Sequence, residues 1–203
     1  MQHTDQVQVE SREQWRGWLG QHARTSRGVW VVTWRAGSGR PRVPYDDLVE
    51  EALCVGWVDS LPRTLDEERT QLLMTARKPG SGWSRPNKQR VARLREQGLM
   101  LAPGEAVVAA AEVDGSWTAL DDVEDLVEPP DLSAALDADP EARRHWDAFP
   151  RSARRGILEW VQGAKKPETR AKRVVETAQQ AARGERANQW RGRQTPGGHR
   201  APG

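Results

Sequence analysis

The chain has 203 residues, of which 36% are hydrophobic and 30% are charged, and its formal net charge is +2. This length suits one large domain or two small ones with a buried core. A single cysteine, Cys54, excludes an intramolecular disulfide, and the four histidines lack zinc-ligand spacing. The sequence has neither a signal-peptide core nor an apolar run near the ~20 residues of a membrane helix. We therefore expect a cytoplasmic chain with no membrane span, metal or cofactor.

Charge is distributed unevenly along the chain. Residues 1–150 carry 18 basic and 25 acidic side chains, whereas residues 151–203 carry 13 basic and 4 acidic ones. Within the first part, residues 111–150 hold 12 acids. We expect the acidic segment and the basic segment that follows it to neutralise each other. The alternative is an exposed basic face for phosphates or anionic surfaces.

Hydrophobic spacing predicts mixed helices and strands up to about residue 120. In chain order we expect a helix capped by Ser11 and reaching His22, a strand at 29–34, a helix from Tyr45 that ends before Gly56, a hairpin of strands at 57–63 and 70–77, and helices at 84–97 and 103–113. The uninterrupted β-prone run Val29–Trp34 is typical of a central strand.

The second part is predicted to be helical. The acidic stretch Asp121–Pro130 indicates a linker, and helices are expected at 132–136, 140–149, 152–164 and 167–183. The fold prediction is therefore α+β. A small antiparallel or mixed sheet flanked by helices covers residues 10–120, a helical C-terminal module covers 131–186, and a disordered tail covers 187–203.

Three ordered motifs carry a resemblance to a known family. They are ALCVGWVDS at 52–60, RKPGSGWSRPNK at 77–88 and AKKPETRAKR at 164–173, and WRGWL at 15–19 also fits. Together they resemble the YdeI/OmpD-associated family, often labelled bacteriocin-protection proteins, over residues 10–186. The resemblance implies association with an outer-membrane porin and protection against bacteriocins or cationic antimicrobial peptides. It brings no agreed catalytic mechanism.

The first two motifs face each other across the predicted hairpin. If the turn centres near Glu67, Asp59 opposes Thr75 and Trp57 opposes Arg77, so that all four share one face. Asp59 and Arg77 would then be diagonal neighbours within reach of each other. One interpretation is a structural salt bridge beside core tryptophans. The other is a pocket for an anion, because a glycine-rich loop followed by a helix start can hold phosphate or carboxylate.

These motifs define the candidate ligand-binding residues Trp57, Asp59, Ser60, Arg77, Lys78, Trp83, Ser84 and Asn87. No catalytic residue is assigned. The function predicted is a non-catalytic binding or stress-protection protein with a protein partner or a small anionic ligand. The alternative is an enzyme that acts on a small anionic substrate around Trp57, Asp59, Arg77 and Asn87.

Two further features, a group of basic residues in the third motif and the single cysteine, each have a structural and a functional interpretation. Lys165, Lys166, Arg170 and Arg173 form a candidate basic patch, with either a structural role or a phosphate-bearing partner. Glu168 is placed to pair locally with one of the arginines. Cys54 is interpreted as a small buried hydrophobe rather than a nucleophile. No recognised nucleic-acid-binding signature is present, so nucleic acid is not expected, and the oligomeric state stays open.

Overall fold

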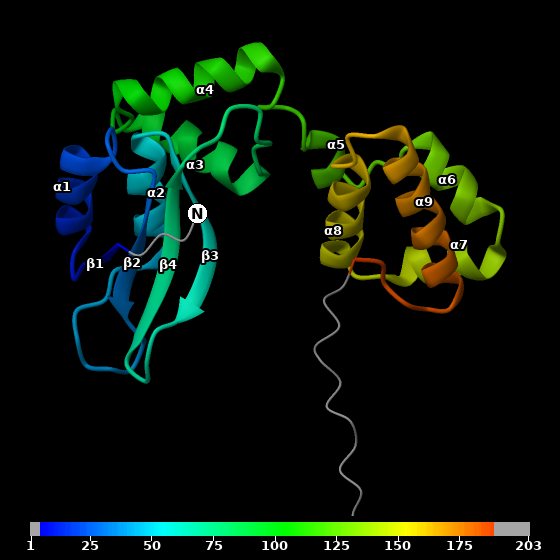
Figure 1. Cartoon of the computed structure of the whole chain (residues 1–203), viewed down its shortest axis with the longest axis horizontal. Helices are drawn as coiled ribbons and strands as arrows, with labels where there is room; N and C mark the ends of the chain where they lie inside the picture. Colours follow the sequence, from blue (N-terminus) through cyan, green and yellow to red (C-terminus); the bar gives the residue numbers. More distant parts are fainter. Residues whose placement is uncertain (1–4, 189–203) are drawn as a thin grey trace, which may run out of the picture. The chain divides into compact units, whose positions relative to one another are not determined.

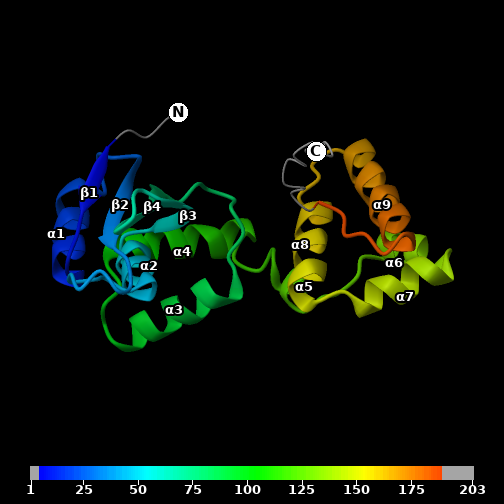
Figure 2. The same ribbon diagram turned by 90° about the horizontal axis from the view of Figure 1, so that it is seen from below.

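The computed structural model describes residues 5–188, and the tail predicted from residue 187 onward falls almost wholly outside them. The elements are β1 (Gln6–Gln8), α1 (Arg12–His22), β2 (Gly28–Trp34), α2 (Tyr45–Cys54), β3 (Trp57–Thr64), β4 (Arg69–Ala76), α3 (Arg85–Glu96), α4 (Ala102–Asp114), α5 (Asp121–Glu124), α6 (Pro130–Asp137), α7 (Pro140–Ala148), α8 (Arg151–Gln162) and α9 (Pro167–Ala182). They form two compact units that divide after Asp121 (Figures 1 and 2). The predicted α+β class is confirmed.

The N-terminal unit is built on a mixed four-stranded sheet with the order β1-β2-β4-β3. Strand β2 runs parallel to β1 and antiparallel to β4, so the uninterrupted apolar run of β2 is a central strand, as predicted. Alternate residues of β2 and β4 (Val29, Val31, Leu72 and Met74) belong to the buried core. That core also contains apolar side chains of α1, α2, α3 and α4. Helix α4 crosses one end of the strands (Figure 1).

Local sequence signals explain the ends of several helices. Ser11 caps α1 and accepts a hydrogen bond from the Gln14 backbone N–H, as predicted. After α2 the chain turns at Gly56, where φ is +79° and a Cβ atom would lie 2.7 Å from Val107 Cγ2. The glycine of the first motif is therefore required by the positive φ and by the close approach of α4.

The C-terminal unit consists of helices around a core that includes Leu132, Leu136, Trp146, Ile157 and Leu158 (Figure 1). The expectation that Asp121–Pro130 is only a linker is wrong, because this stretch contains the short helix α5. Val123 and Glu124 of that helix are buried. Val123 is the apolar residue of this acidic stretch that packs into the core of the C-terminal unit.

Acidic and basic segments neutralise each other within this unit, as expected from the charge distribution. Two pairs cross from the basic to the acidic segment, Arg155–Glu124 at 2.8 Å and Arg170–Asp131 at 2.7 Å. Within the acidic segment itself, Arg143 contacts Glu128 at 2.9 Å. Glu128 also accepts a hydrogen bond from the Trp146 indole N–H at 2.7 Å. These pairs tie the acidic stretch onto the helices that follow it.

Candidate functional site

Side chains of the second motif form a cluster of cations and indole rings. The Arg77 guanidinium carbon lies 3.7 Å from the centroid of the Trp83 ring. The Trp83 ring in turn lies 4.9 Å from that of Trp117, and Lys88 Nζ lies 5.5 Å from the Trp117 ring. Lys88 also contacts Asp121 at 2.5 Å. The planes of the two indole rings are inclined at 53°, so these side chains form one cluster of cation–π and aromatic contacts that contains the first arginine, the tryptophan and the last lysine of RKPGSGWSRPNK.

Within this cluster, the Arg77 guanidinium has two nitrogens that lack a hydrogen-bond partner. Its Nη2 donates to the backbone oxygens of Gly82 (2.5 Å) and Ser81 (3.5 Å). Its Nε and Nη1 are buried and have no hydrogen-bond partner among the described residues. Burial lowers the pKa of Arg77 to about 10, and the charge of Asp59 offsets this only in part. The group is therefore a cation at neutral pH with two unused donors.

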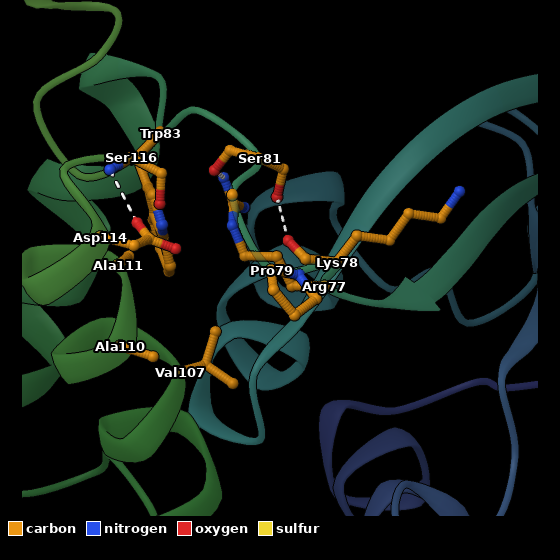
Figure 3. Close-up of a pocket in the computed structure, with 11 residues that line it drawn as sticks. Arg77, Lys78, Pro79, Ser81, Trp83, Val107, Ala110, Ala111, Asp114 and Ser116 are labelled. Atoms are coloured by element: carbon orange, nitrogen blue, oxygen red, sulfur yellow. Dashed lines mark hydrogen bonds between the residues drawn. The ribbon is translucent and has the colours of Figure 1, made fainter.

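A small cavity, here called the loop pocket, lies beside this guanidinium (Figure 3). Its volume is about 70 Å³, and its walls come from the loop after β4, from Trp83 and from α4 with the turn that follows it. On the α4 side, Asp114 accepts a hydrogen bond from the Ser116 backbone N–H at 2.8 Å. On the other side, the Ser81 hydroxyl donates to the Lys78 carbonyl at 2.7 Å. The Lys78 side chain points away from the pocket (Figure 3).

The predicted pairing of Asp59 with Arg77 is wrong. A β-bulge between Asp59 and Leu61 shifts the register, so that Asp59 lies opposite Met74 and Trp57 lies opposite Ala76. Arg77 follows the end of β4, where its backbone N–H donates to the carbonyl of Gly56. The predicted register does hold beyond the bulge, where Leu61 pairs with Leu73. A single extra residue was enough to separate the acid from the guanidinium.

Asp59 has a different partner. The Tyr45 hydroxyl of α2 donates to Asp59 Oδ2 at 2.7 Å. Burial raises the pKa of Tyr45 to about 12, and the hydrogen bond to Asp59 acts in the same direction. This contact joins the start of α2 to the edge strand β3.

The remaining candidates of the first two motifs make separate contacts. The Trp57 indole N–H donates to the Ala23 carbonyl at 3.2 Å, and the Ser60 hydroxyl donates to Leu73 O at 3.3 Å. Ser84 occupies the N-cap position of α3 without a side-chain hydrogen bond there. Asn87 is buried and accepts a hydrogen bond from Arg90 Nη1 at 3.0 Å. The eight candidates therefore do not converge on one point.

A second and larger cavity, here called the helix pocket, lies where α1, α2 and α4 meet the ends of β3 and β4. Its volume is about 540 Å³. Leu19, Trp57, Leu101 and Val107 supply apolar wall, and Arg24 and Arg77 supply the charge. The sequence analysis found only Trp57 and Arg77 among these. The others come from segments far apart in the chain, so no spacing in the sequence brings them together. In the structure, Leu101 marks the place as a large apolar residue that is 48% exposed.

The basic patch near the third motif is largely engaged within the protein. Arg170 of α9 makes a bidentate contact with Asp131 of α6, at 2.7 and 2.8 Å. Arg173 donates to the Trp160 carbonyl and lies over the Trp160 ring at 4.9 Å. The predicted local pairing of Glu168 with one of these arginines is replaced by these longer-range contacts. Of the four predicted residues, Lys165 and Lys166 remain exposed.

A buried carboxylate that the sequence analysis missed joins α1 to α2. Glu51 is 2% exposed and accepts hydrogen bonds from Arg12 (2.5 Å) and from Arg16 (2.6 and 2.7 Å). Burial alone would raise the pKa of Glu51, but the hydrogen bonds from Arg16 and Arg12 outweigh it, and the pKa is lowered. Nearby, burial and the charge of Glu51 raise the pKa of the Cys54 thiol to about 11. The thiol is therefore protonated at neutral pH.

Residues 5–188 contain no group of three or more histidine, cysteine, aspartate or glutamate side chains placed to hold a metal ion. None of the helices in this part of the chain combines the length and the apolar character that crossing a bilayer requires.

Comparison with known proteins divides the chain in the same way as the fold. Residues 125–184 match the family described as "Bacteriocin-protection, YdeI or OmpD-Associated". Residues 7–107 match a different family, described as a domain of unknown function. The third motif lies in the first of these matches, and the first two motifs lie in the second. No curated protein and no solved structure matches the chain.

Proposed function

We propose that the protein is a non-catalytic binding protein that contributes to protection against bacteriocins or cationic antimicrobial peptides, because its residues 125–184 match the family described as bacteriocin-protection, YdeI or OmpD-associated. We further propose that its N-terminal unit binds a small anionic group at Arg77. The family match supports the first part. The second part depends on the chemistry of a single guanidinium.

The observation that carries the binding site is the state of the Arg77 side chain. A buried cation is costly unless an anion or enough hydrogen-bond acceptors compensate it. Trp83 and two backbone carbonyls compensate Arg77 in part, and Nε and Nη1 remain without a partner among the described residues. A carboxylate or phosphate would supply both the missing acceptors and the missing charge.

Access to these donors requires movement. Neither nitrogen is reached by solvent, and the loop that covers the guanidinium contains the exposed residues Lys78, Pro79 and Gly80. Displacement of this loop, which connects β4 to α3, exposes the guanidinium to an incoming anion. Binding should therefore order the loop and protect it from proteolysis.

Binding rather than catalysis is favoured by the groups nearby. The Cys54 thiol is protonated at neutral pH, which makes it a poor nucleophile. The Asp59 carboxylate accepts a hydrogen bond from the Tyr45 hydroxyl at 2.7 Å. Binding needs only the positive charge and the donors of Arg77, whereas the enzyme alternative would need a nucleophile or base beside Arg77, and the Cys54 thiol does not serve as one at neutral pH.

The test uses acetate and inorganic phosphate as probes, with titration calorimetry and thermal unfolding as readouts. We expect one anion to bind the wild-type protein and to raise its melting temperature, and we expect Arg77→Met to abolish both effects. Arg42→Met is the matched control, because Arg42 is exposed and lines neither pocket. Equal binding by wild type and Arg77→Met, or no binding of either anion by wild type, would overturn the proposed site.

The protective role is tested separately in cells. A deletion strain should become more sensitive to a cationic antimicrobial peptide, and a plasmid copy of the full chain should restore resistance. The Arg77→Met copy, expressed at equal level, shows whether anion binding contributes to that protection. Unchanged peptide sensitivity of the deletion strain would contradict the protective role and leave the binding site standing.

A further inference from the structure

The two cavities beside Arg77 differ in size and in charge. The loop pocket has a volume of about 70 Å³, which is room for roughly two water molecules. The helix pocket, at about 540 Å³, is within the range of roughly 300–1,000 Å³ that is typical of cavities for small organic molecules. Arg77 and Val107 line both cavities. A ligand whose charged end reaches Arg77 therefore has space for a body only on the side of the helix pocket.

The charged residues that line the two cavities also favour the helix pocket as the place of an anionic ligand. Asp114 lines the loop pocket, and its carboxylate would repel a second anion placed there. Of the described residues that line the helix pocket, Arg24 and Arg77 are charged and none carries a carboxylate. The helix pocket therefore offers an anionic ligand Arg24 and, once the loop after β4 is displaced from the buried guanidinium, Arg77 as well, without a competing acid.

The walls of the helix pocket indicate the rest of the ligand. Leu19 and Val107 present aliphatic side chains, Trp57 presents an indole, and Leu101 stands 48% exposed at the rim. Apolar walls around a small number of charged groups are the usual composition of a site for an amphipathic small molecule. The side-chain nitrogen of Trp57 is already occupied by the Ala23 carbonyl, so Trp57 contributes only apolar surface.

We propose that the ligand of the N-terminal unit is an amphipathic monocarboxylate, whose carboxylate pairs with Arg77 and whose apolar body lies in the helix pocket against Leu19, Leu101 and Val107. This inference rests on the proposed function, because it uses the same guanidinium. It adds the class of the ligand and the cavity that holds its body.

The experiment compares acetate, butanoate, hexanoate and octanoate by titration calorimetry on the full chain. Each buried methylene is worth about 0.8 kcal/mol, so the affinity should rise by about three- to fourfold for each methylene until the cavity is full. Hexan-1-ol, which lacks the carboxylate, should bind at least tenfold more weakly than hexanoate. Binding of hexan-1-ol equal to that of hexanoate would overturn the proposed ligand class.

A pair of glycine substitutions in α1 tests the location of the body. Gly20 lines the helix pocket, and a Cβ atom at this position meets no other atom within 4 Å. Gly20→Phe should therefore place a ring in the cavity and remove the gain of octanoate over acetate. Gly17→Phe is the matched control, because Gly17 is also free of contacts within 4 Å and does not line the cavity.

The outcomes separate this inference from the proposed function. If acetate or phosphate binds in an Arg77-dependent way but chain length has no effect, the ligand class is wrong and the anion site stands. If affinity rises with chain length equally in wild type and Gly20→Phe, the body lies elsewhere and the assignment to the helix pocket fails. If no anion in the series binds, the inference and the anion site fail together.

Discussion

Replacement of Arg77 by methionine separates a structural role of this side chain from a binding role. Methionine keeps most of the length and the apolar stem of arginine but removes the charge and the donors. If Arg77 is retained because it holds the loop in place, Arg77→Met should destabilise the protein strongly. If Arg77 is retained for an external anion, the loss of the charge should have little effect on stability and a large one on binding.

The magnitude follows from the environment of the guanidinium. The fall of its pKa from the ordinary value of an arginine to about 10 corresponds to roughly 3 kcal/mol at about 1.4 kcal/mol per tenfold change in proton affinity. Partial exposure to solvent reduces this cost to about 1–2 kcal/mol. The stacking on Trp83 and the hydrogen bond to Gly82 together return about 1–2 kcal/mol. The two contributions nearly cancel.

We therefore expect the unfolding free energy of Arg77→Met to lie within about 1 kcal/mol of the wild-type value at pH 7, measured by urea denaturation of each protein. Removing one partner from a fully paired buried ion pair costs about 3–5 kcal/mol instead. A loss of 3 kcal/mol or more would show that the guanidinium is a structural element of the loop. The reasoning about an unmatched charge would then be refuted.

Three further predictions concern the N-terminal core. Gly104→Ala should destabilise the protein by about 2–4 kcal/mol, because its Cβ would lie 2.4 Å from the Cys54 carbonyl oxygen. Gly20→Ala, which meets nothing within 4 Å, should change the unfolding free energy by less than about 1 kcal/mol, and equal losses in the two would contradict the packing argument. The Cys54 thiol should react with an aromatic disulfide reagent at pH 8 at least about 100-fold more slowly than free cysteine, since its pKa is about 11; a fast reaction would show an accessible thiolate. Glu51, whose pKa is below its ordinary value of 4.5, contributes stability that is present above pH 4.5 and lost as the pH falls toward the lower folded value. The stability advantage of wild type over Glu51→Gln should shrink over that range, and a constant difference from pH 7 to pH 3 would contradict the assignment.

The elements of the fold were predictable because local chemistry specifies them. The capping serine before α1, the continuous apolar run of β2 and the glycine after α2 each act within a few residues. Their positions in the structure agree with the prediction to within a residue or two. The short helix α5 was missed because four residues carry too little periodicity to be distinguished from an acidic loop.

The candidate site was predictable only in part, because long-range register decides it. The hairpin itself was expected, but the bulge after Asp59 gives no sequence signal, and it moved the acid to a partner on α2. The stacking of Arg77 on Trp83 lies within one loop, and although the second motif contains both residues, their contact was not predicted. The helix pocket combines residues from α1, β3 and α4, a combination that no spacing in the sequence could reveal.

Ala110 offers a way to supply the missing anion from within the chain. This residue lies on α4, lines the loop pocket and is exposed at its edge, below the Arg77 side chain in Figure 3. A glutamate there can extend toward the unused donors of the guanidinium and take the place of an external carboxylate. Ala109→Glu is the matched control, because Ala109 is exposed on the same helix and lines neither pocket.

Ala110→Glu places a carboxylate four residues before Asp114, and Ala109→Glu places one four residues after Glu105, so both variants carry a similar repulsion between like charges. Because only the glutamate at position 110 can pair with Arg77, we expect Ala110→Glu to be more stable than Ala109→Glu by about 1 kcal/mol, which corresponds to about 2–4 °C in melting temperature. Ala110→Glu should also weaken acetate binding at least tenfold, because the new carboxylate competes for the same charge. Arg77→Met should remove the stabilisation in the double variant, since nothing then pairs with the glutamate. If Ala110→Glu is no more stable than Ala109→Glu and binds acetate with wild-type affinity, Arg77 does not accept anions from this side. The loop pocket would then be excluded as the place of the anion, because a carboxylate tethered within reach is the most favourable case for the pairing, and the helix pocket would be the remaining side from which a carboxylate can reach Arg77.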